Sequence, residues 1–105
     1  MRTVEYKGNK WNTDDDGFID DFNNWNKEWV ELVASSEGIK ELIDDHWIVI
    51  NYLQDFYKKN SVAPMIRLLI KNTGFKLKYI YKLFPSGPAK GACKMAGLPK
   101  PTGCV

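Results

Sequence analysis

The chain has 105 residues, of which 44% are hydrophobic and 27% charged, so length and composition predict one soluble globular domain with a single modest core. No run approaches the roughly 18 apolar residues of a transmembrane helix, and the acidic, aromatic N-terminus is unlike a signal peptide, so we expect a cytoplasmic protein. Thirteen acids and five bases fall in residues 1–55, but ten bases and no acid follow, which predicts either an anionic partner for the C-terminal half or packing of the two halves against each other.

The first predicted element is a short β-hairpin. Residues 3–7 and 10–13 have strand character and flank Gly8-Asn9, a dipeptide typical of two-residue hairpin turns. A polar turn follows at residues 13–17 and superficially resembles a calcium-binding loop. Asn23 stands where such a loop needs a bidentate carboxylate, so we expect no calcium site.

Five helical segments are predicted next. The first runs from about 21 to 34 and carries Trp25 and Trp29 on its apolar face, at a spacing typical of core residues. The others span about 44–59, 64–73, 76–84 and 88–97, with helix-ending signals such as Gly74 between them. The sequence therefore predicts a mainly α-helical small bundle with an N-terminal hairpin and a flexible C-terminal arm.

The third and fourth helices, joined across Asn72-Thr73-Gly74, have the length and turn of a helix-turn-helix. Basic residues cluster on them: Arg67, Lys71, Lys76, Lys78 and Lys82. A DNA-binding regulator is therefore one possible function. The recognition helix would be KLKYIYKLF, which lacks the Arg, Asn, Gln and Glu side chains that read base edges and offers mainly phosphate contacts.

No conventional active site emerges from the spacing of the residues. Two cysteines and His46 are too few for a closed four-ligand zinc site, and we assign His46 no role. Neither a Cys-His pair nor a glycine-rich phosphate loop after a strand can be derived from the sequence.

The last dozen residues form the candidate functional segment. Cys104 is the penultimate residue and Cys93 lies eleven positions earlier, across a stretch with two glycines and two prolines that disfavours helix and strand. Extended, residues 98–104 span about 23–25 Å, enough to carry a thiol into a partner's channel. Folded back, the same stretch could bring both thiols to disulfide distance. Two thiols on such an arm suit a carrier of sulfur or electrons.

We predict a lowered pKa for neither thiol. Lys90, Lys94 and Lys100 favour the thiolate, whereas the helix C-terminus at Cys93 and the chain's own carboxylate at Cys104 oppose it by a similar amount.

The segment LFPSGPAKGACKMAGLPKPTGCV, residues 83–105, resembles the C-terminal signature of the DsrC/TusE family, also called the gamma subunit of dissimilatory sulfite reductase. The resemblance extends through most of the chain, in DDDGF at 14–18, DDHW at 44–47, APMIR at 63–67 and KNTGFKL at 71–77. Cys104 matches the family's sulfur-carrying cysteine. Cys93 matches a second cysteine that is absent from the TusE-like sulfurtransferases of tRNA thiolation, so the resemblance implies the DsrC branch.

This resemblance implies a sulfur-carrier protein of dissimilatory sulfur metabolism that is not catalytic alone. Its arm is expected to enter the catalytic subunits of sulfite reductase, DsrA and DsrB, and to bring Cys104 to the siroheme. The sulfur then leaves as a trisulfide between Cys104 and Cys93, which a membrane complex reduces. We expect no cofactor or metal on this chain, and siroheme and iron–sulfur clusters in the partner.

Within a single domain of residues 1–105, we expect residues 1–96 to form the globular core and residues 97–105 a mobile arm. The arm residues expected to contact the partner are Pro99, Lys100, Pro101, Thr102 and Gly103. Two alternative functions stay open: a helix-turn-helix DNA-binding regulator and a TusE-like sulfurtransferase.

Overall fold

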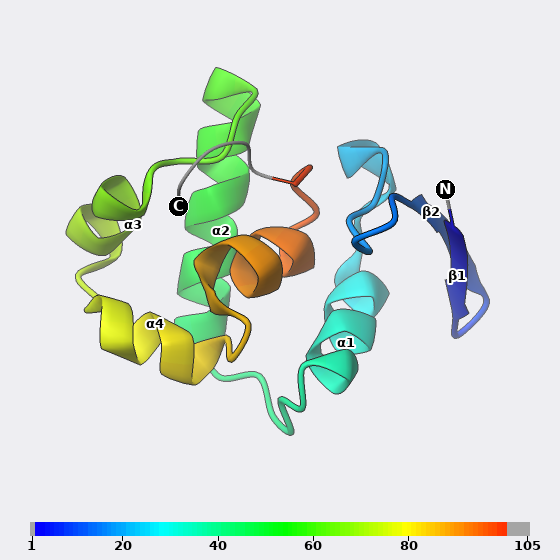
Figure 1. Cartoon of the computed structure of the whole chain (residues 1–105), viewed down its shortest axis with the longest axis horizontal. Coiled ribbons are helices and arrows are strands. Elements are labelled where there is room, and N and C mark those ends of the chain that lie inside the picture. Colours follow the sequence, from blue (N-terminus) through cyan, green and yellow to red (C-terminus); the bar gives the residue numbers. More distant parts are fainter. Residues whose placement is uncertain (1, 101–105) are drawn as a thin grey trace.

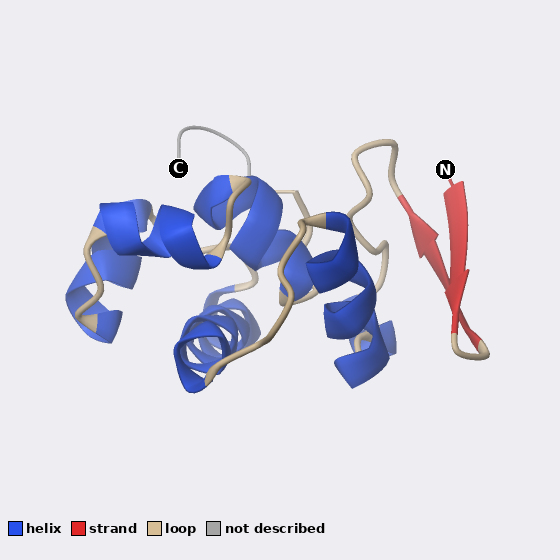
Figure 2. Cartoon of the chain, turned by 90° about the horizontal axis from the view of Figure 1, so that it is seen from below, coloured by secondary structure: helices blue, strands red, loops and turns tan. Residues whose placement is uncertain are grey.

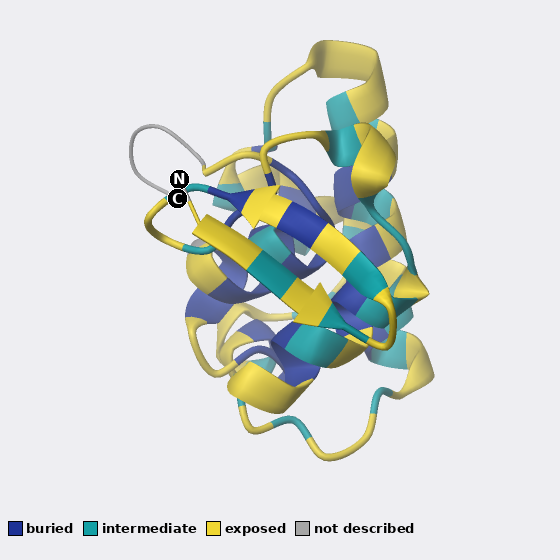
Figure 3. Cartoon of the chain, turned by 90° about the vertical axis from the view of Figure 1, so that its right-hand side faces the viewer, coloured by how far each residue is buried: buried dark blue, intermediate teal, exposed yellow. Residues whose placement is uncertain are grey.

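The N-terminal hairpin is present, but its turn lies one residue earlier than predicted. In the computed structural model, which describes residues 2–100, β1 (Arg2–Tyr6) pairs with β2 (Asn9–Thr13) in an antiparallel register. The turn is therefore Lys7-Gly8, with φ angles of 48° and 82°. This register turns Trp11 toward the core, and side chains along β2 alternate between buried and exposed (Figure 3). A shift by one residue would reverse the faces, so the burial of Trp11 accounts for the turn's position.

The predicted first helix is interrupted. A 3-10 turn, η1 (Phe22–Asn24), precedes the helix α1 (Lys27–Ser36). The side chains of Asp21 and Asn26 each accept a hydrogen bond from a backbone N–H of the element that follows, at 2.9 and 3.0 Å. Two successive N-caps start two separate helical elements. Trp25 therefore lies in the linker between them rather than on α1.

The remaining helices lie close to their predicted positions. α3 begins just after Met65, whose extended backbone leaves Pro64 ahead of the helix instead of in its first turn. The last helix winds more widely than an α-helix, as a π-helix, and continues as an α-turn to Met95. The bounds are α2 (Asp44–Asn60), α3 (Ile66–Thr73), α4 (Leu77–Leu83) and η2 (Pro88–Cys93).

Helix α2 lies in the middle of the molecule, and the last helix crosses in front of it (Figure 1). Helices α3 and α4 lie on one side of this pair, and α1 lies on the other, with the hairpin beyond it (Figures 1 and 2). The fully buried apolar residues include Val49, Ile50 and Leu53 of α2 and Ala92, Cys93, Met95, Ala96 and Leu98 at the chain's C-terminal end. Burial of this apolar surface is the main stabilising contribution. The mainly α-helical fold with a hairpin and a helix-turn-helix is confirmed.

His46 joins the start of α2 to the end of α4. The backbone N–H of Ile43 donates to its Nδ1 at 3.1 Å, so the ring proton is on Nε2, which lies 2.9 Å from the carbonyl oxygen of Leu83. Its ring also packs edge-on against Phe84, with centroids 5.2 Å apart. Both nitrogens are satisfied, so His46 is a structural residue.

Candidate functional site

Cys93 lies inside the core, in the last turn of η2, with 1% of its surface exposed. Burial raises the pKa of the Cys93 thiol to about 12, because removal from water disfavours the thiolate. The predicted balance of opposing charges does not hold for Cys93, since the effect of burial dominates. In this arrangement the sulfur is protonated and shielded.

The helix that carries Cys93 ends in a Schellman motif. Gly97 has a φ of +83°, a left-handed conformation that glycine adopts without a steric penalty. This bend lets the N–H of Leu98 donate to the Cys93 carbonyl oxygen at 3.0 Å and the N–H of Gly97 donate to the Lys94 carbonyl oxygen at 3.1 Å. Leu98 is fully buried, as is usual for the apolar residue that closes this motif.

Three side chains from distant parts of the chain bind the same helix end. The donors are the indole Nε1–H groups of Trp29 and Trp25 and the amide Nε2–H of Gln54. They lie 2.8, 2.9 and 3.0 Å from the carbonyl oxygens of residues 94, 95 and 96, respectively. Every carbonyl from 93 to 96 thus has a partner, although the end of a helix usually leaves four of them without one. We call Trp25, Trp29 and Gln54 the carbonyl clamp.

Beyond Leu98 the chain reaches the surface at Pro99 and Lys100. The Lys100 ammonium donates to Asp16 Oδ2 at 2.7 Å, which connects the start of the arm to the turn after β2. This hydrogen bond and the attraction of the opposite charges lower the pKa of Asp16 and raise the pKa of Lys100. Because both side chains are more than half exposed, the pair contributes little to stability.

Of the predicted site residues, the structure describes Cys93, Pro99 and Lys100. Cys104 and the other predicted arm residues, Pro101, Thr102 and Gly103, lie outside the described residues. The division into a core of residues 1–96 and an arm of residues 97–105 stays a prediction, but Gly97 and Leu98 are packed as tightly as core residues.

The carbonyl clamp was missed by sequence reasoning. The helical spacing of Trp25 and Trp29 indicated core packing, and Trp29 is indeed 2% exposed. Their second role depends on the indole N–H, which usually finds an acceptor when the ring is buried. This preference indicates from the sequence that each buried indole has an acceptor, but it does not identify the carbonyl oxygens of Met95 and Lys94 as those acceptors.

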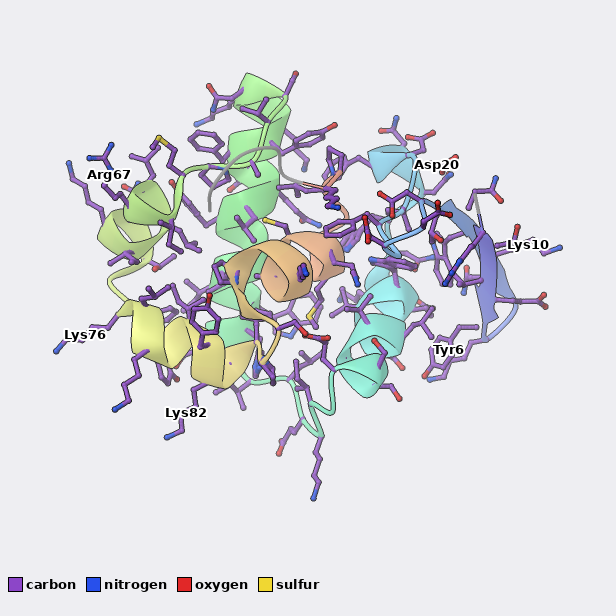
Figure 4. All side chains as sticks on the ribbon, in the orientation of Figure 1. Tyr6, Lys10, Asp20, Arg67, Lys76 and Lys82 are labelled. Carbon is purple, nitrogen blue, oxygen red and sulfur yellow. The ribbon has the colours of Figure 1, made fainter. Side chains whose placement is uncertain are left out.

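The α3–α4 surface carries the predicted basic cluster. Arg67, Lys76 and Lys82 point outward from the side of the molecule opposite the hairpin (Figure 4). Exposed apolar side chains lie on the same two helices or just before them: Met65, Leu68, Leu77 and Tyr81. Within residues 2–100, no helix is long and apolar enough to cross a membrane.

Comparison with known proteins places these features in a family. The model of the family described as DsrC like protein matches residues 5–105. The chain is 63% identical over 105 residues to the dissimilatory-type sulfite reductase subunit gamma of Nitratidesulfovibrio vulgaris (strain Hildenborough), with all of both chains covered. It is 37% identical over 107 aligned residues to the sulfurtransferase TusE of Escherichia coli (strain K12), covering 95% of this chain and 97% of the relative.

Solved structures agree with these matches. A crystal structure of dissimilatory sulfite reductase I contains a chain that is 59% identical, with a TM-score of 0.94 and coverage of 99% of this chain and 100% of that chain. The oxidised gamma subunit of the dissimilatory sulfite reductase (DsrC) from Archaeoglobus fulgidus is 46% identical, with a TM-score of 0.88 and the same coverage. With its sequence matched from residue 5 to its end and its fold matched almost throughout, the chain belongs to the DsrC family.

Proposed function

We propose that this protein is a sulfur carrier and a co-substrate of a siroheme-containing sulfite reductase, with Cys104 receiving the sulfur and Cys93 closing the product. The observation that carries the proposal is the 63% identity, over the full length, with a sulfite reductase subunit gamma. The partner is expected to be the pair of catalytic subunits, DsrA and DsrB. The sulfurtransferase TusE, at 37% identity, supports sulfur transfer as the common activity of such chains.

Both thiols take part in the proposed reaction, and each supplies one electron to the sulfite sulfur. Sulfite and two thiols, with four protons and two electrons from the partner, give a trisulfide and three waters. The sulfite sulfur gains four electrons, two of them from the Cys93 and Cys104 thiols and two from the partner. A membrane complex then supplies four electrons and four protons, which return both thiols and release hydrogen sulfide. The chain itself needs no cofactor in this scheme, because siroheme and iron–sulfur clusters are expected in the partner.

The arm must leave the core where the partner can reach it. The described chain reaches the surface at Pro99 and Lys100, directly after the helix end that the carbonyl clamp holds. This position supports an arm comprising Pro99, Lys100, Pro101, Thr102 and Gly103 that places Cys104 inside the partner while the core stays outside.

The test is turnover of sulfite by purified catalytic subunits with this chain present. Mass spectrometry of the C-terminal peptide should detect one extra sulfur atom bridging Cys93 and Cys104 in the wild type. Cys104→Ala should form no sulfur-loaded product, whereas Cys93→Ala should carry the sulfur on Cys104 without the bridge. Sulfur loading of the Cys104→Ala variant would contradict the proposal.

A TusE-like sulfurtransferase is the second candidate, favoured by the match to TusE over nearly the whole chain. In that case Cys104 would pass a persulfide sulfur to an acceptor and Cys93 would be dispensable. Equal transfer rates for the wild type and Cys93→Ala, with no bridged product, would favour this candidate over the carrier.

A further inference from the structure

The proposed function sets a requirement that the structure does not meet as it stands. Cys93 must bond to a sulfur atom delivered by Cys104, yet Cys93 is 1% exposed and belongs to the hydrophobic core. A buried, protonated thiol is inert toward such chemistry. Residues 94–98, at the end of the last helix, must therefore move away from the core before Cys93 can react.

Two kinds of contact resist opening: the burial of Met95, Ala96 and Leu98 in the core, and a small set of hydrogen bonds. Cys93 to Leu98 are held by the Schellman hydrogen bonds and by three side-chain donors from 42 to 70 positions earlier in the chain. The helix itself is a π-helix, a form that is rare in proteins and often found at functional sites. Its final carbonyls have no further helical turn to bind them, so the clamp takes the place of that turn.

The three side chains of the carbonyl clamp differ in exposure, and therefore in how readily their hydrogen bonds to the helix end can break. Trp29 and Gln54 are buried, at 2% and 7% exposure, whereas Trp25 is half-buried and lies in the linker between η1 and α1. Trp25 also lines a surface hollow with Lys27, Trp47 and Asn51. The space beside Gly97 is filled by the Trp25 side chain, because a Cβ at Gly97 would stand 2.8 Å from Trp25 Cδ1. Trp25 is thus the clamp residue that touches both the helix end and the surface.

We propose that Trp25, Trp29 and Gln54 are positioning residues for the sulfur chemistry of Cys93, and that release of their hold on residues 94–96 is the step that exposes the Cys93 thiol. This inference rests on the proposed function. When the clamp is closed, the arm leaves the core in a set direction and Cys93 is protected from premature oxidation. When it opens, residues 94–98 move outward, and the buried side chains of Met95, Ala96 and Leu98 leave the core with them.

The test measures alkylation of Cys93 by iodoacetamide in a Cys104→Ser background, so that a single thiol is labelled and iodide is the leaving group. Trp25→Phe keeps an aromatic ring but removes the donor to the carbonyl of Met95. Loss of such a bond should raise the population of the open state, and with it the labelling rate, by about five- to thirtyfold. Gln54→Met, which removes the donor to the Ala96 carbonyl oxygen, should also raise the labelling rate of Cys93. It replaces Trp25→Phe as the test variant if Trp25→Phe does not fold.

Tyr79→Phe is the control. The Tyr79 hydroxyl donates to the Asp45 carboxylate at the start of α2, nine positions before Gln54, so the variant keeps the ring and loses one side-chain donor away from residues 94–98. Hydrogen exchange of the Leu98 amide gives a second readout, which Trp25→Phe should accelerate and Tyr79→Phe should leave unchanged. The proposal is overturned by an unchanged Cys93 labelling rate in both folded clamp variants. It is equally overturned if Tyr79→Phe raises labelling as much, since Cys93 would then be exposed by global unfolding.

No partner and no sulfite enter this measurement. A failure here would therefore leave the carrier function intact, whereas a failure of sulfur loading on Cys104 would leave the opening of the clamp intact.

Discussion

The Cys93 thiol is enclosed where the last helix meets the core, and burial raises its pKa to about 12. At physiological pH the proton therefore stays on the sulfur while the helix end is closed. The nearby lysines of this basic half of the chain do not offset the loss of hydration. The reactivity of this residue is consequently a property of how often it is exposed, rather than of the charges beside it.

We predict that this thiol makes the protein less stable in alkali. The unfolded thiol ionises near its ordinary pKa of 9.0, whereas the pKa of the folded thiol is about 12. Between these values the unfolded state binds fewer protons, so the free energy of unfolding falls as the pH rises. From about pH 7.5 to about pH 10.5 the wild type should lose about 2 kcal/mol more than Cys93→Ala in urea unfolding. Equal losses would show that Cys93 is not buried in the folded state.

At the scale of single elements, the end of the last helix depends on a position that only glycine suits. The Schellman motif requires a left-handed residue at 97, and Trp25 occupies the space where a side chain would stand. Gly74, at the end of α3, has a similar φ of +79°, but no atom lies within 4 Å of the Cβ it lacks. The two glycines therefore share a backbone requirement and differ in their surroundings.

We expect Gly97→Ala to cost more stability than Gly74→Ala. Both substitutions force a left-handed alanine, at about 1–2 kcal/mol. Gly97→Ala must in addition displace the Trp25 ring, which weakens the hydrogen bond from that indole to Met95. Chemical denaturation of the two variants measures the difference directly. Equal costs would indicate that Trp25 yields without loss and that the clamp is not tightly fitted.

At the scale of the whole molecule, the acidic and basic halves do not fully cover each other. The Asp16–Lys100 ion pair joins them at the start of the arm. The basic cluster on α3 and α4 nevertheless faces outward at the end remote from the hairpin (Figure 4). An anionic partner for this surface, one of the two explanations of the charge division, therefore fits the observed placement of the charges.

We predict that any duplex DNA binding by this surface is weak and indifferent to sequence. Helix α4 presents lysine and tyrosine, which contact phosphates rather than base edges. Fluorescence anisotropy should detect affinity that falls steeply between about 50 and about 200 mM salt, and Lys78→Gln should reduce the salt dependence. A preference above about a thousandfold for one duplex at physiological salt would instead support a regulator.

The sequence by itself determined most of the helices and the presence of the hairpin, whereas the two-cysteine arm stays a prediction. These features rest on local signals, such as apolar periodicity, caps and turn residues, which act over a few positions. The Asn26 cap, which separates η1 from α1, is also a local signal. The prediction of one continuous helix followed the apolar periodicity across Asn26 instead.

Only the tertiary structure decided the burial of Cys93, the acceptors of the Trp25 and Trp29 indoles and the bond between His46 Nε2 and the carbonyl oxygen of Leu83. The partners of these groups lie 37 to 70 positions away in the chain. Periodicity states which face of a helix is buried, but not which carbonyl will stand opposite a buried donor. That choice depends on how the helices cross, and it is made when α1, α2 and the last helix pack together.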